Sequence, residues 1–347
     1  MKKRTLLAAL SGSAAFLGMR SLSVLGTTAL KQSNLIKPRA LKAGDTVGII
    51  TPSSPILDPD DRAKIPVLLD SWGLRVKFAP HVGSRGTFSE SIGDRADDLH
   101  AMFADPEVQA IMMQGGYGAM QILDRLDWNL IANNPKIFVG FSDITALHLA
   151  IHQKTRLVTF HGPNPFSIFN EYTSNTFQQA LFQTQPLGIL TNPPEDNPRR
   201  PTHRLRTVRS GQGTGALIGG NLSLIAALMG TPFEIETAGK ILFLEDIGEG
   251  TYQIDRMLTQ LRLAGKFAGV RGIIWAECNR CGTNSPNSTS IYTLGEVIDG
   301  ILGSVGVPVL SGMTLGHTAN KLTLPLGIEA TLDAEAGTLE ILDSGVV

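Results

Sequence analysis

Short apolar runs alternate with helix-like segments in the first half of the chain, and this alternation constrains the fold more than any other feature. The runs 47–50, 108–113 and 137–141 are almost entirely apolar instead of alternating with polar residues. Strands of that kind are buried on both faces, and the helices between them provide the cover. The pattern predicts an α/β fold built on a parallel sheet, with further strands at 76–79 and 157–160.

A proline-rich stretch divides the chain. Five of the nineteen prolines fall between residues 166 and 206, and such stretches are typical of connections between domains. We therefore expect a linker at 166–206 between an N-terminal α/β domain, 37–165, and a C-terminal β/α domain, 207–347. The second domain is expected to contain strands at 241–244, 272–275 and 307–310 and a terminal β-ribbon made of 322–324, 328–332 and 338–342.

The first 36 residues differ from the rest of the chain. Lys2, Lys3 and Arg4 precede a mostly apolar stretch, residues 6–17. A basic start followed by a short apolar run is the layout of a secretory signal. We expect residues 1–36 to be a presequence, either a signal peptide or a disordered basic tail. Export to the periplasm follows from the first of these, and a cytoplasmic location is the alternative.

Charge and hydropathy exclude two classes of partner. The formal net charge is −1 over 347 residues, and the body of the chain has no run of Lys or Arg. Nucleic-acid binding of a general kind is therefore disfavoured. No uninterrupted apolar stretch reaches the roughly 18 residues that a spanning helix needs, so we expect no stable membrane span in the mature chain.

Cysteines and histidines do not form a metal motif. Cys278 and Cys281 are the only two cysteines, spaced C-x-x-C, and neither a second pair nor a nearby histidine cluster completes a zinc site. A local disulfide formed after export, or two idle thiols, explains them better than a catalytic dithiol. His148 and His152, one helical turn apart, are better explained as a packed or surface pair than as metal ligands.

The segment Gly140-Phe141-Ser142-Asp143 is the strongest local sign of chemistry. An expected strand runs directly into an expected helix with Ser142 at the corner, as in a nucleophile elbow. The free amides at the start of that helix, Asp143 first, could stabilise an oxyanion. Ile144 stands where the second glycine of G-x-S-x-G would be, so the alternative is that Ser142 or Asp143 only caps the helix.

A glycine-rich loop, Gly115-Gly116-Tyr117-Gly118, follows the third expected strand. Glycines allow a close backbone approach to a ligand and present bare amides. The loop lies at the same sheet edge as Ser142, which is the usual ligand edge of open α/β sheets. Its spacing matches neither a dinucleotide fingerprint nor a P-loop.

A serine nucleophile needs a base and an orienting acid. His317 lies in an expected loop before a strand, where catalytic side chains are common. Glu245 and Asp246 end an apolar run, and a carboxylate at a buried strand end is costly unless it is paired. That favours a functional partner, although Arg256 or Arg262 could provide a structural one.

Taken together, the chain resembles the LD-carboxypeptidase family of serine peptidases, which also contains the microcin C self-immunity peptidases. The resemblance covers about residues 38–345. It is carried by these blocks: Asp94-Arg95-Ala96 with Asp98-Leu99; Gly115 to Gly118; Gly140 to His148; His161-Gly162-Pro163; Gly219-Gly220-Asn221-Leu222; Leu244-Glu245-Asp246 followed by Ile254 to Leu258; and Gly316-His317 with Pro325 and Gly327.

The resemblance implies a Ser-Glu-His triad. It makes Ser142 the nucleophile, Glu245 the acid and His317 the base, with the backbone amides of Gly116 and Asp143 as the oxyanion site. It further implies Gly115, Tyr117 and Asn221 as substrate-binding residues. The family fold would be an N-terminal flavodoxin-like domain and a C-terminal swivelling β/α domain, forming a homodimer without metal or cofactor.

The resemblance also implies a substrate. We expect hydrolysis of the amide bond between an L-centre residue and a C-terminal D-amino acid, with removal of D-Ala from the murein tetrapeptide as the reaction. Within the same class, the alternative is hydrolysis of aminoacyl-nucleotide conjugates of the microcin C kind. From another class, an exported peptide-binding protein could use the same two-domain cleft without catalysis.

Overall fold

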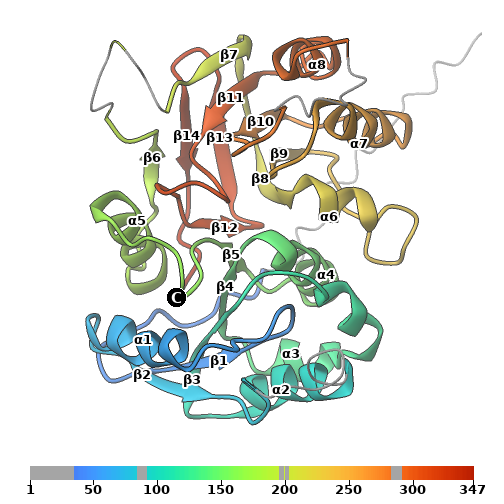
Figure 1. Ribbon diagram of the computed structural model, residues 1–347. Helices are drawn as coiled ribbons and strands as arrows, with labels where there is room; N and C mark the ends of the chain where they lie inside the picture. The colour runs from blue at the N-terminus through green and yellow to red at the C-terminus, as the bar shows by residue number, and fades with distance from the viewer. Residues whose placement is uncertain (1–34, 84–91, 195–198, 200–202, 283–290) are drawn as a thin grey trace, which may run out of the picture. The chain divides into compact units, whose positions relative to one another are not determined.

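The structure, a computed structural model, describes residues 35–83, 92–194, 199, 203–282 and 291–347. Residues 34–347 form one compact unit built on two β-sheets (Figure 1). The predicted presequence, 1–36, lies outside the described residues except for its last two. Of these, Ile36 forms a parallel bridge to Leu157 and packs against the core.

The first sheet has the strand order β12-β5-β4-β3-β1-β2. Its strands are β1 (Thr46–Ile50), β2 (Arg75–Phe78), β3 (Val108–Met113), β4 (Ile137–Gly140), β5 (Thr159–His161) and β12 (Leu324–Leu326). All neighbours pair in parallel except β12, which is antiparallel to β5. The order of the five parallel strands is the flavodoxin-like order, so the predicted parallel sheet is confirmed.

Helices cover this sheet as the apolar runs require. They are α1 (Pro59–Asp70), α2 (Ile92–Ala104), the 3-10 helix η1 (Ala119–Arg125), α3 (Trp128–Asn133), the 3-10 turn η2 (Ser142–Ile144) and α4 (Thr145–Thr155). Helix α1 packs against β2, and α2 packs against β1 and β3. On α2 the side chains of Leu99 and Phe103 are fully buried. Such burial on both faces of the sheet is the main source of its stability.

The second sheet is mixed, with the order β6-β14-β13-β8-β9-β10-β11-β7. Its strands are β6 (Gly188–Leu190), β7 (Arg206–Arg209), β8 (Gln212–Asn221), β9 (Lys240–Glu245), β10 (Gly272–Ala276), β11 (Val309–Met313), β13 (Glu329–Asp333) and β14 (Thr338–Ile341). Strands β8 to β11 are parallel, and the others pair antiparallel at the two edges. Its helices are α6 (Leu222–Ala227), α7 (Thr251–Leu263) and α8 (Leu294–Ile301).

Two segments differ from the sequence-based expectations. The region predicted as a linker contains α5 (Glu171–Phe182) and strand β6, which extends the edge of the second sheet. The first piece of the predicted terminal ribbon lies in the other sheet, because β12 pairs with β5. Both segments are placed by pairing with strands that are distant in the sequence, which local patterns do not encode.

No helix in the described part of the chain has the length and apolar character needed to cross a membrane.

Candidate active site

Ser142 occupies a strained corner at the end of β4. Its φ is +65°, a left-handed value that is uncommon for a residue with a side chain. The turn is tight, since a Cβ added to Gly140 would lie 3.2 Å from the Ile144 side chain. Helix α4 follows the 3-10 turn that Ser142 begins. The strand-turn-helix geometry therefore presents the hydroxyl at the carboxyl edge of the first sheet.

His317 links this hydroxyl to a carboxylate of the second sheet. Its Nε2 lies 3.0 Å from Ser142 Oγ, and its Nδ1 lies 2.7 Å from Glu245 Oε2. Glu245 ends β9 and is fully buried, whereas the His317 side chain is 15% exposed. With Nδ1–H donating to the carboxylate, Nε2 is left to accept the Ser142 proton. The structure thus brings together the three side chains that the sequence analysis proposed as a triad.

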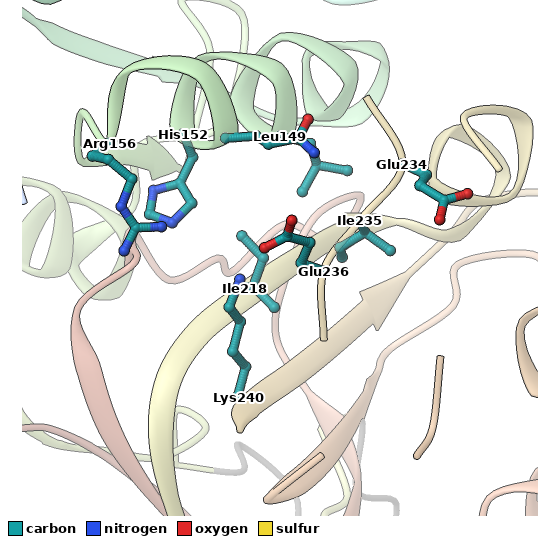
Figure 2. A pocket seen from close by; sticks show the side chains of 9 residues that line it. Leu149, His152, Arg156, Ile218, Glu234, Ile235, Glu236 and Lys240 are labelled. Atoms are coloured by element: carbon teal, nitrogen blue, oxygen red, sulfur yellow. The ribbon is translucent and has the colours of Figure 1, made fainter. Parts of the chain in front are cut away.

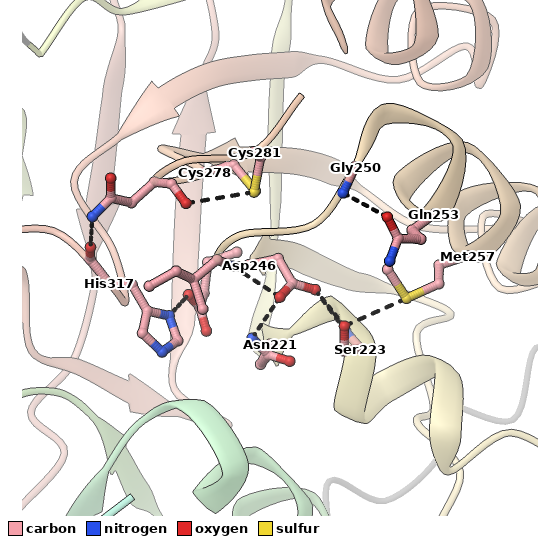
Figure 3. The surroundings of a disulfide bond; sticks show 12 residues. Asn221, Ser223, Asp246, Gly250, Gln253, Met257, Cys278, Cys281 and His317 are labelled. Atoms are coloured by element: carbon pink, nitrogen blue, oxygen red, sulfur yellow. Dashed lines mark hydrogen bonds and ion pairs between the residues drawn. A yellow bond between two sulfur atoms is a disulfide. The ribbon is translucent and has the colours of Figure 1, made fainter. Parts of the chain in front are cut away.

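The loop that carries His317 packs closely against the Glu245 carboxylate. Gly316 has a φ of +70°, and a Cβ there would lie 2.1 Å from Glu245 Oε2. On the other side, Asn279 Nδ2 donates to the His317 carbonyl at 3.1 Å (Figure 3). The Phe141 ring contacts the imidazole edge-on, with the ring centroids 5.0 Å apart. These contacts leave the imidazole little freedom to turn away from Ser142.

A disulfide closes the loop that contains Asn279. Cys278 and Cys281 are bonded to each other in the structure (Figure 3). The Asn279 carbonyl accepts the Gly248 amide at 2.9 Å, just beyond the end of β9. The disulfide loop therefore touches both the His317 loop and the segment that follows Glu245. Of the two alternatives left open by the sequence, the structure contains the disulfide.

Lys321 is a buried cation beside the triad, and the sequence analysis missed it. Its ammonium lies 4.2 Å from the centre of the Phe141 ring and 3.4 Å from Ser167 Oγ, and the residue is 5% exposed. Burial lowers the pKa of Lys321 to about 8, an effect that the negative charge of Glu245 partly opposes. Its only sequence signal is its place four residues after His317, next to an apolar run.

Replacing Lys321 by methionine should stabilise the protein at neutral pH. Lys321 has a pKa of about 8 in the folded protein and about 10.5 in the unfolded chain. Between pH 8 and pH 10.5 the unfolded chain therefore carries this proton more often than the folded protein does. Stability of the parent protein should therefore rise with pH across that window. The variant should gain about 2–3 kcal/mol at pH 7, and the gain should shrink toward pH 10.5.

Urea unfolding at pH 7 and pH 10 measures this difference. Lys64→Met is the matched control, because Lys64 has a side chain that is 69% exposed. The prediction would be contradicted if Lys321→Met and the parent differed in unfolding free energy by the same amount at both pH values.

The glycine loop lies directly against Ser142. A Cβ on Gly115 would be 3.8 Å from Ser142 Cβ, and one on Gly116, whose φ is +129°, would collide with the Ser54 hydroxyl. Ser54 holds this loop by accepting the Tyr117 amide at 3.3 Å. The Tyr117 side chain is 75% exposed. The two amides predicted for the oxyanion site are those of Asp143 and Gly116. Asp143 directly follows Ser142, and Gly116 follows Gly115, which lies beside Ser142.

The side chain of Asp143 points back to fasten the same loop. Its carboxylate accepts the Ser53 hydroxyl at 2.5 Å and the Ala119 amide at 2.7 Å. Burial raises the pKa of Asp143, and these hydrogen bonds partly oppose the rise. Arg95 closes the other end of the loop by donating to the Gly118 carbonyl at 3.0 Å. Ser53 and Ser54 follow β1 at the ligand edge of the sheet, a position that could have identified them from the sequence.

Asn221 joins the two sheets near the site. Its backbone amide donates to Thr145 Oγ1 at 2.9 Å, and its side chain donates to Asp246 Oδ1 at 3.2 Å (Figure 3). Asp246 also accepts from Ser223 Oγ at 2.8 Å, and burial raises the pKa of this carboxyl group. Asn221 is 3% exposed, so the structure gives it a structural role, and its contact with a substrate stays a prediction.

Of the two histidines of α4, His148 is a packing residue, and His152 is buried at the far end of the helix. His148 is fully buried, and its Nε2 lies 2.9 Å from the Gly140 carbonyl, which helps to fix the turn before Ser142. Burial lowers the pKa of His148 to about 4. Within the described ranges, no group of three His, Cys, Asp or Glu side chains is placed to hold a metal ion.

Comparisons with known proteins match both halves of the chain. Residues 47–162 match the LD-carboxypeptidase N-terminal domain, and residues 214–332 match the LD-carboxypeptidase C-terminal domain. The chain is 38% identical over 317 residues to the probable murein peptide carboxypeptidase of Bacillus subtilis (strain 168), a match that covers 89% of this chain and 95% of that protein.

Solved structures agree with this result. An MccF-like protein from Bacillus anthracis (strain Ames) superposes with a TM-score of 0.78 at 32% identity, over 88% of this chain and 99% of that one. The structure of MccF in complex with glutamyl sulfamoyl guanosine also gives a TM-score of 0.78, at 27% identity and over 90% and 99% of the two chains. By its domain matches and its similarity to relatives along most of its length, the chain belongs to the LD-carboxypeptidase family.

Proposed function

We propose that this protein is a serine carboxypeptidase in which Ser142, His317 and Glu245 act as a catalytic triad. The observation that carries the proposal is the continuous chain of contacts from Ser142 Oγ through both imidazole nitrogens to a fully buried carboxylate. A nucleophile, a base and an orienting acid in this order are what acyl transfer by a serine requires. A protein that only binds peptides has no need of such an arrangement.

The geometry supports a two-step reaction. Ser142 Oγ attacks the carbonyl carbon of the scissile amide while His317 Nε2 takes its proton. His317 then gives that proton to the leaving nitrogen, and the terminal amino acid departs. Water then attacks the acyl-enzyme while His317 Nε2 accepts a proton from the water. His317 next gives this proton to Ser142 Oγ as the acyl bond breaks, and the free enzyme is restored. Glu245 stabilises the imidazolium in both steps.

The tetrahedral intermediate needs donors for its negative oxygen. The amides of Asp143 and Gly116 are suited to this role, because one begins the turn after Ser142 and the other belongs to the loop against it. Preorganised amides of this kind contribute about 2.7–4 kcal/mol each to the stability of a transition state. The polar anchors of the loop, Asp143 Oδ2 and Ser54 Oγ, would keep the Gly116 amide in place.

The substrate that we propose is a murein tetrapeptide, from which the enzyme removes the terminal D-Ala. Two observations support this choice: the family is one of LD-carboxypeptidases, and the relative in Bacillus subtilis bears the name of a murein peptide carboxypeptidase. Gly115 and the exposed Tyr117 side chain are the groups on the glycine loop that would meet the peptide. The second candidate is an aminoacyl-nucleotide conjugate, which the MccF complex with glutamyl sulfamoyl guanosine favours.

Mass spectrometry of products distinguishes these substrates. Purified protein is incubated with lysine-type and diaminopimelate-type murein tetrapeptide, with a diastereomer that ends in L-Ala, and with glutamyl sulfamoyl guanosine. The proposal predicts loss of one alanine from a tetrapeptide that ends in D-Ala and none from its diastereomer. Cleavage of the nucleotide conjugate alone would establish the second candidate instead. Tight binding of peptide without any product would favour a binding protein.

We further propose that the protein works outside the cytoplasm and, as the family resemblance implies, as a homodimer. The basic and apolar opening of the sequence and the Cys278–Cys281 disulfide support export, because disulfides persist in oxidising compartments. Fractionation of cells and thiol labelling of the native protein test the compartment, and sedimentation tests the dimer.

Replacing Asp143 by asparagine should weaken catalysis through the glycine loop. Asparagine lacks the negative charge that the Arg95 guanidinium favours, and it replaces one carboxylate oxygen by an NH₂ group, which donates and cannot accept from the surrounding amides and hydroxyl, so the Gly116 amide should lose its position. We expect kcat to fall about 100-fold and the free energy of unfolding to drop by about 1–3 kcal/mol. Steady-state kinetics and urea unfolding measure the two effects.

Asp127→Asn is the matched control for this variant, because Asp127 caps α3 in the same half of the molecule and accepts the Asn129 and Leu130 amides. Asparagine caps a helix about as well as aspartate, so this variant should change neither kcat nor the free energy of unfolding by much. Unchanged turnover in Asp143→Asn would show that Asp143 does not support the oxyanion site.

A further inference from the structure

A small cavity lies at the end of α4 that is remote from Ser142. Its volume is about 60 Å³. Its polar lining consists of His152, Gln153, Arg156, Glu234, Glu236 and Lys240. Helix α4 has 11 residues, so this end is about 16 Å from the turn that carries Ser142. Figure 2 shows His152 and Arg156 reaching the cavity from α4 and Lys240 reaching it from β9.

Three of the six polar side chains that line this cavity, His152, Arg156 and Lys240, carry nitrogen donors. Arg156 ends α4 in a left-handed conformation, with φ +63°, and its Nε is buried without a hydrogen-bond partner in the described structure. His152 is 4% exposed, and its Nδ1 is likewise buried and without a partner there. The side-chain amide oxygen of Gln153 is also buried without a hydrogen-bond partner in the described structure. Lys240 completes the set from the first residue of β9.

The charges of these groups affect one another. Burial, together with the neighbouring charges of Lys240 and Arg156, lowers the pKa of His152 to about 4, and a hydrogen bond to the Leu157 backbone partly opposes the shift. Burial also lowers the pKa of Lys240, and the charge of Arg156 acts in the same direction, whereas the charge of Glu236 raises it. Two cations and an imidazole therefore face a shared space in which each disfavours the charge of the others.

Two carboxylates lie nearby, and only Glu236 acts on the charge of Lys240. Glu234 is engaged elsewhere, with Lys266 Nζ at 2.9 Å and the Gly230 amide at 2.8 Å. Glu236 is exposed, and among the ion pairs of the described residues none joins it to Arg156 or Lys240. Arg156 and Lys240 are half-buried, and cations withdrawn from water favour a negative partner, so the cluster can accept a further anion.

We propose that this cavity is a binding site for a small tetrahedral oxyanion, such as phosphate, held by Arg156, Lys240 and His152. The volume suits one such group and excludes a whole nucleotide. A guanidinium presents paired donors to an oxyanion, and an ammonium adds a point charge. The same chemistry could come from free phosphate or from the phosphoryl group of a phosphate monoester whose remainder lies outside the cavity.

The position of the cavity gives the ligand a structural effect. Arg156 follows α4, which begins beside Ser142, and Lys240 begins β9, which ends at Glu245. A bound oxyanion would join the far ends of the two elements that carry these groups. It should therefore stabilise the packing of the first sheet against the second, whatever reaction the triad performs.

Thermal unfolding in the presence of inorganic phosphate tests the proposal. The full chain is titrated with phosphate from 0 to about 50 mM, with chloride replaced so that ionic strength stays constant, since nonspecific salt effects would otherwise contribute. We expect a saturable rise in melting temperature, as for any ligand that binds only the folded state. A second series with glycerol 3-phosphate distinguishes the two sources: a saturable rise there shows that the cavity also accepts a monoester, and its absence restricts the ligand to free phosphate.

Four variants locate the site. Arg156→Gln and Lys240→Met should each weaken phosphate binding at least tenfold, whereas Lys64→Gln, on the exposed face of α1, should bind as the parent does. Two single variants are used so that poor folding of one leaves the other as a test, with circular dichroism as the check on folding. The absence of a saturable rise in the parent protein would overturn the proposal, as would unchanged binding in both variants. Binding that appears only in Glu236→Gln would also overturn it, because it would show that the Glu236 carboxylate is the occupant.

Discussion

Replacing Ser142 by alanine should reduce the hydrolysis of a suitable peptide by a factor of at least about 10⁴ while leaving the fold intact. Oγ is the one atom that the change removes, and in the proposed mechanism it is the atom that attacks the substrate. Alanine meets the same backbone strain at φ +65° as serine does, so the free energy of unfolding should change by less than about 1 kcal/mol. Single-turnover kinetics with product detection by mass spectrometry measure the loss.

The variants of His317 separate a triad from an independent set of contacts. His317→Ala should be about as inactive as Ser142→Ala, and the double variant should be no worse than either one, because groups that act as a unit are not additive. If Ser142→Ala retains a tenth or more of the parent activity, Ser142 is not the nucleophile. If the two losses multiply in the double variant, the residues do not act together.

Replacing Glu245 by glutamine should lower kcat by about 10⁴-fold, the second largest effect that we expect. Glutamine has nearly the same shape, but it cannot stabilise an imidazolium on His317. If its NH₂ group turns toward Nδ1, it also forces the proton onto Nε2, where a base must be free. The carboxylate is fully buried and lies 2.7 Å from the ring nitrogen, so water cannot replace it.

The adjacent residue provides a matched control. Asp246 is also buried at the end of β9, but its partners are the Asn221 side chain, Ser223 and the Ile247 amide. Asp246→Asn should therefore cost about 1–3 kcal/mol of unfolding free energy, with less than a tenfold loss of kcat. Comparable losses of kcat in both variants would indicate that damage to the end of β9, and not the loss of the Glu245 charge, is responsible.

Much of the fold could be predicted because its parallel strands are buried on both faces. Apolar runs such as 108–113 and 137–141 mark such strands directly. Strand β8 escaped prediction because four of its residues are glycines, which carry no strand signal. The structure explains two of them: a Cβ at Gly213 or Gly219 would lie 1.9 Å from a carbonyl oxygen of the neighbouring chain segment.

The candidate site likewise contains some residues that the sequence predicts and others that it does not. The position of Ser142 follows from a strand that runs into a helix, a local pattern, and the roles of Glu245 and His317 rest on the family resemblance together with their places at a strand end and in a loop. The buried Lys321 and the anchoring carboxylate of Asp143 depend on which distant segments meet, and neither has a periodicity of its own. Sequence patterns report local geometry, whereas these contacts exist only in the assembled molecule.

The pairing of β12 with β5 also makes the first sheet depend on a segment from the second half of the sequence. The first sheet takes its last strand from Leu324–Leu326, close to the end of the chain, and the Pro38 carbonyl accepts the amide of Val347. A chain that stops before Leu324 therefore lacks an edge strand of the very sheet that bears Ser142. The first half of the sequence supplies the nucleophile of the proposed triad, but it does not supply every strand of the sheet that holds this residue.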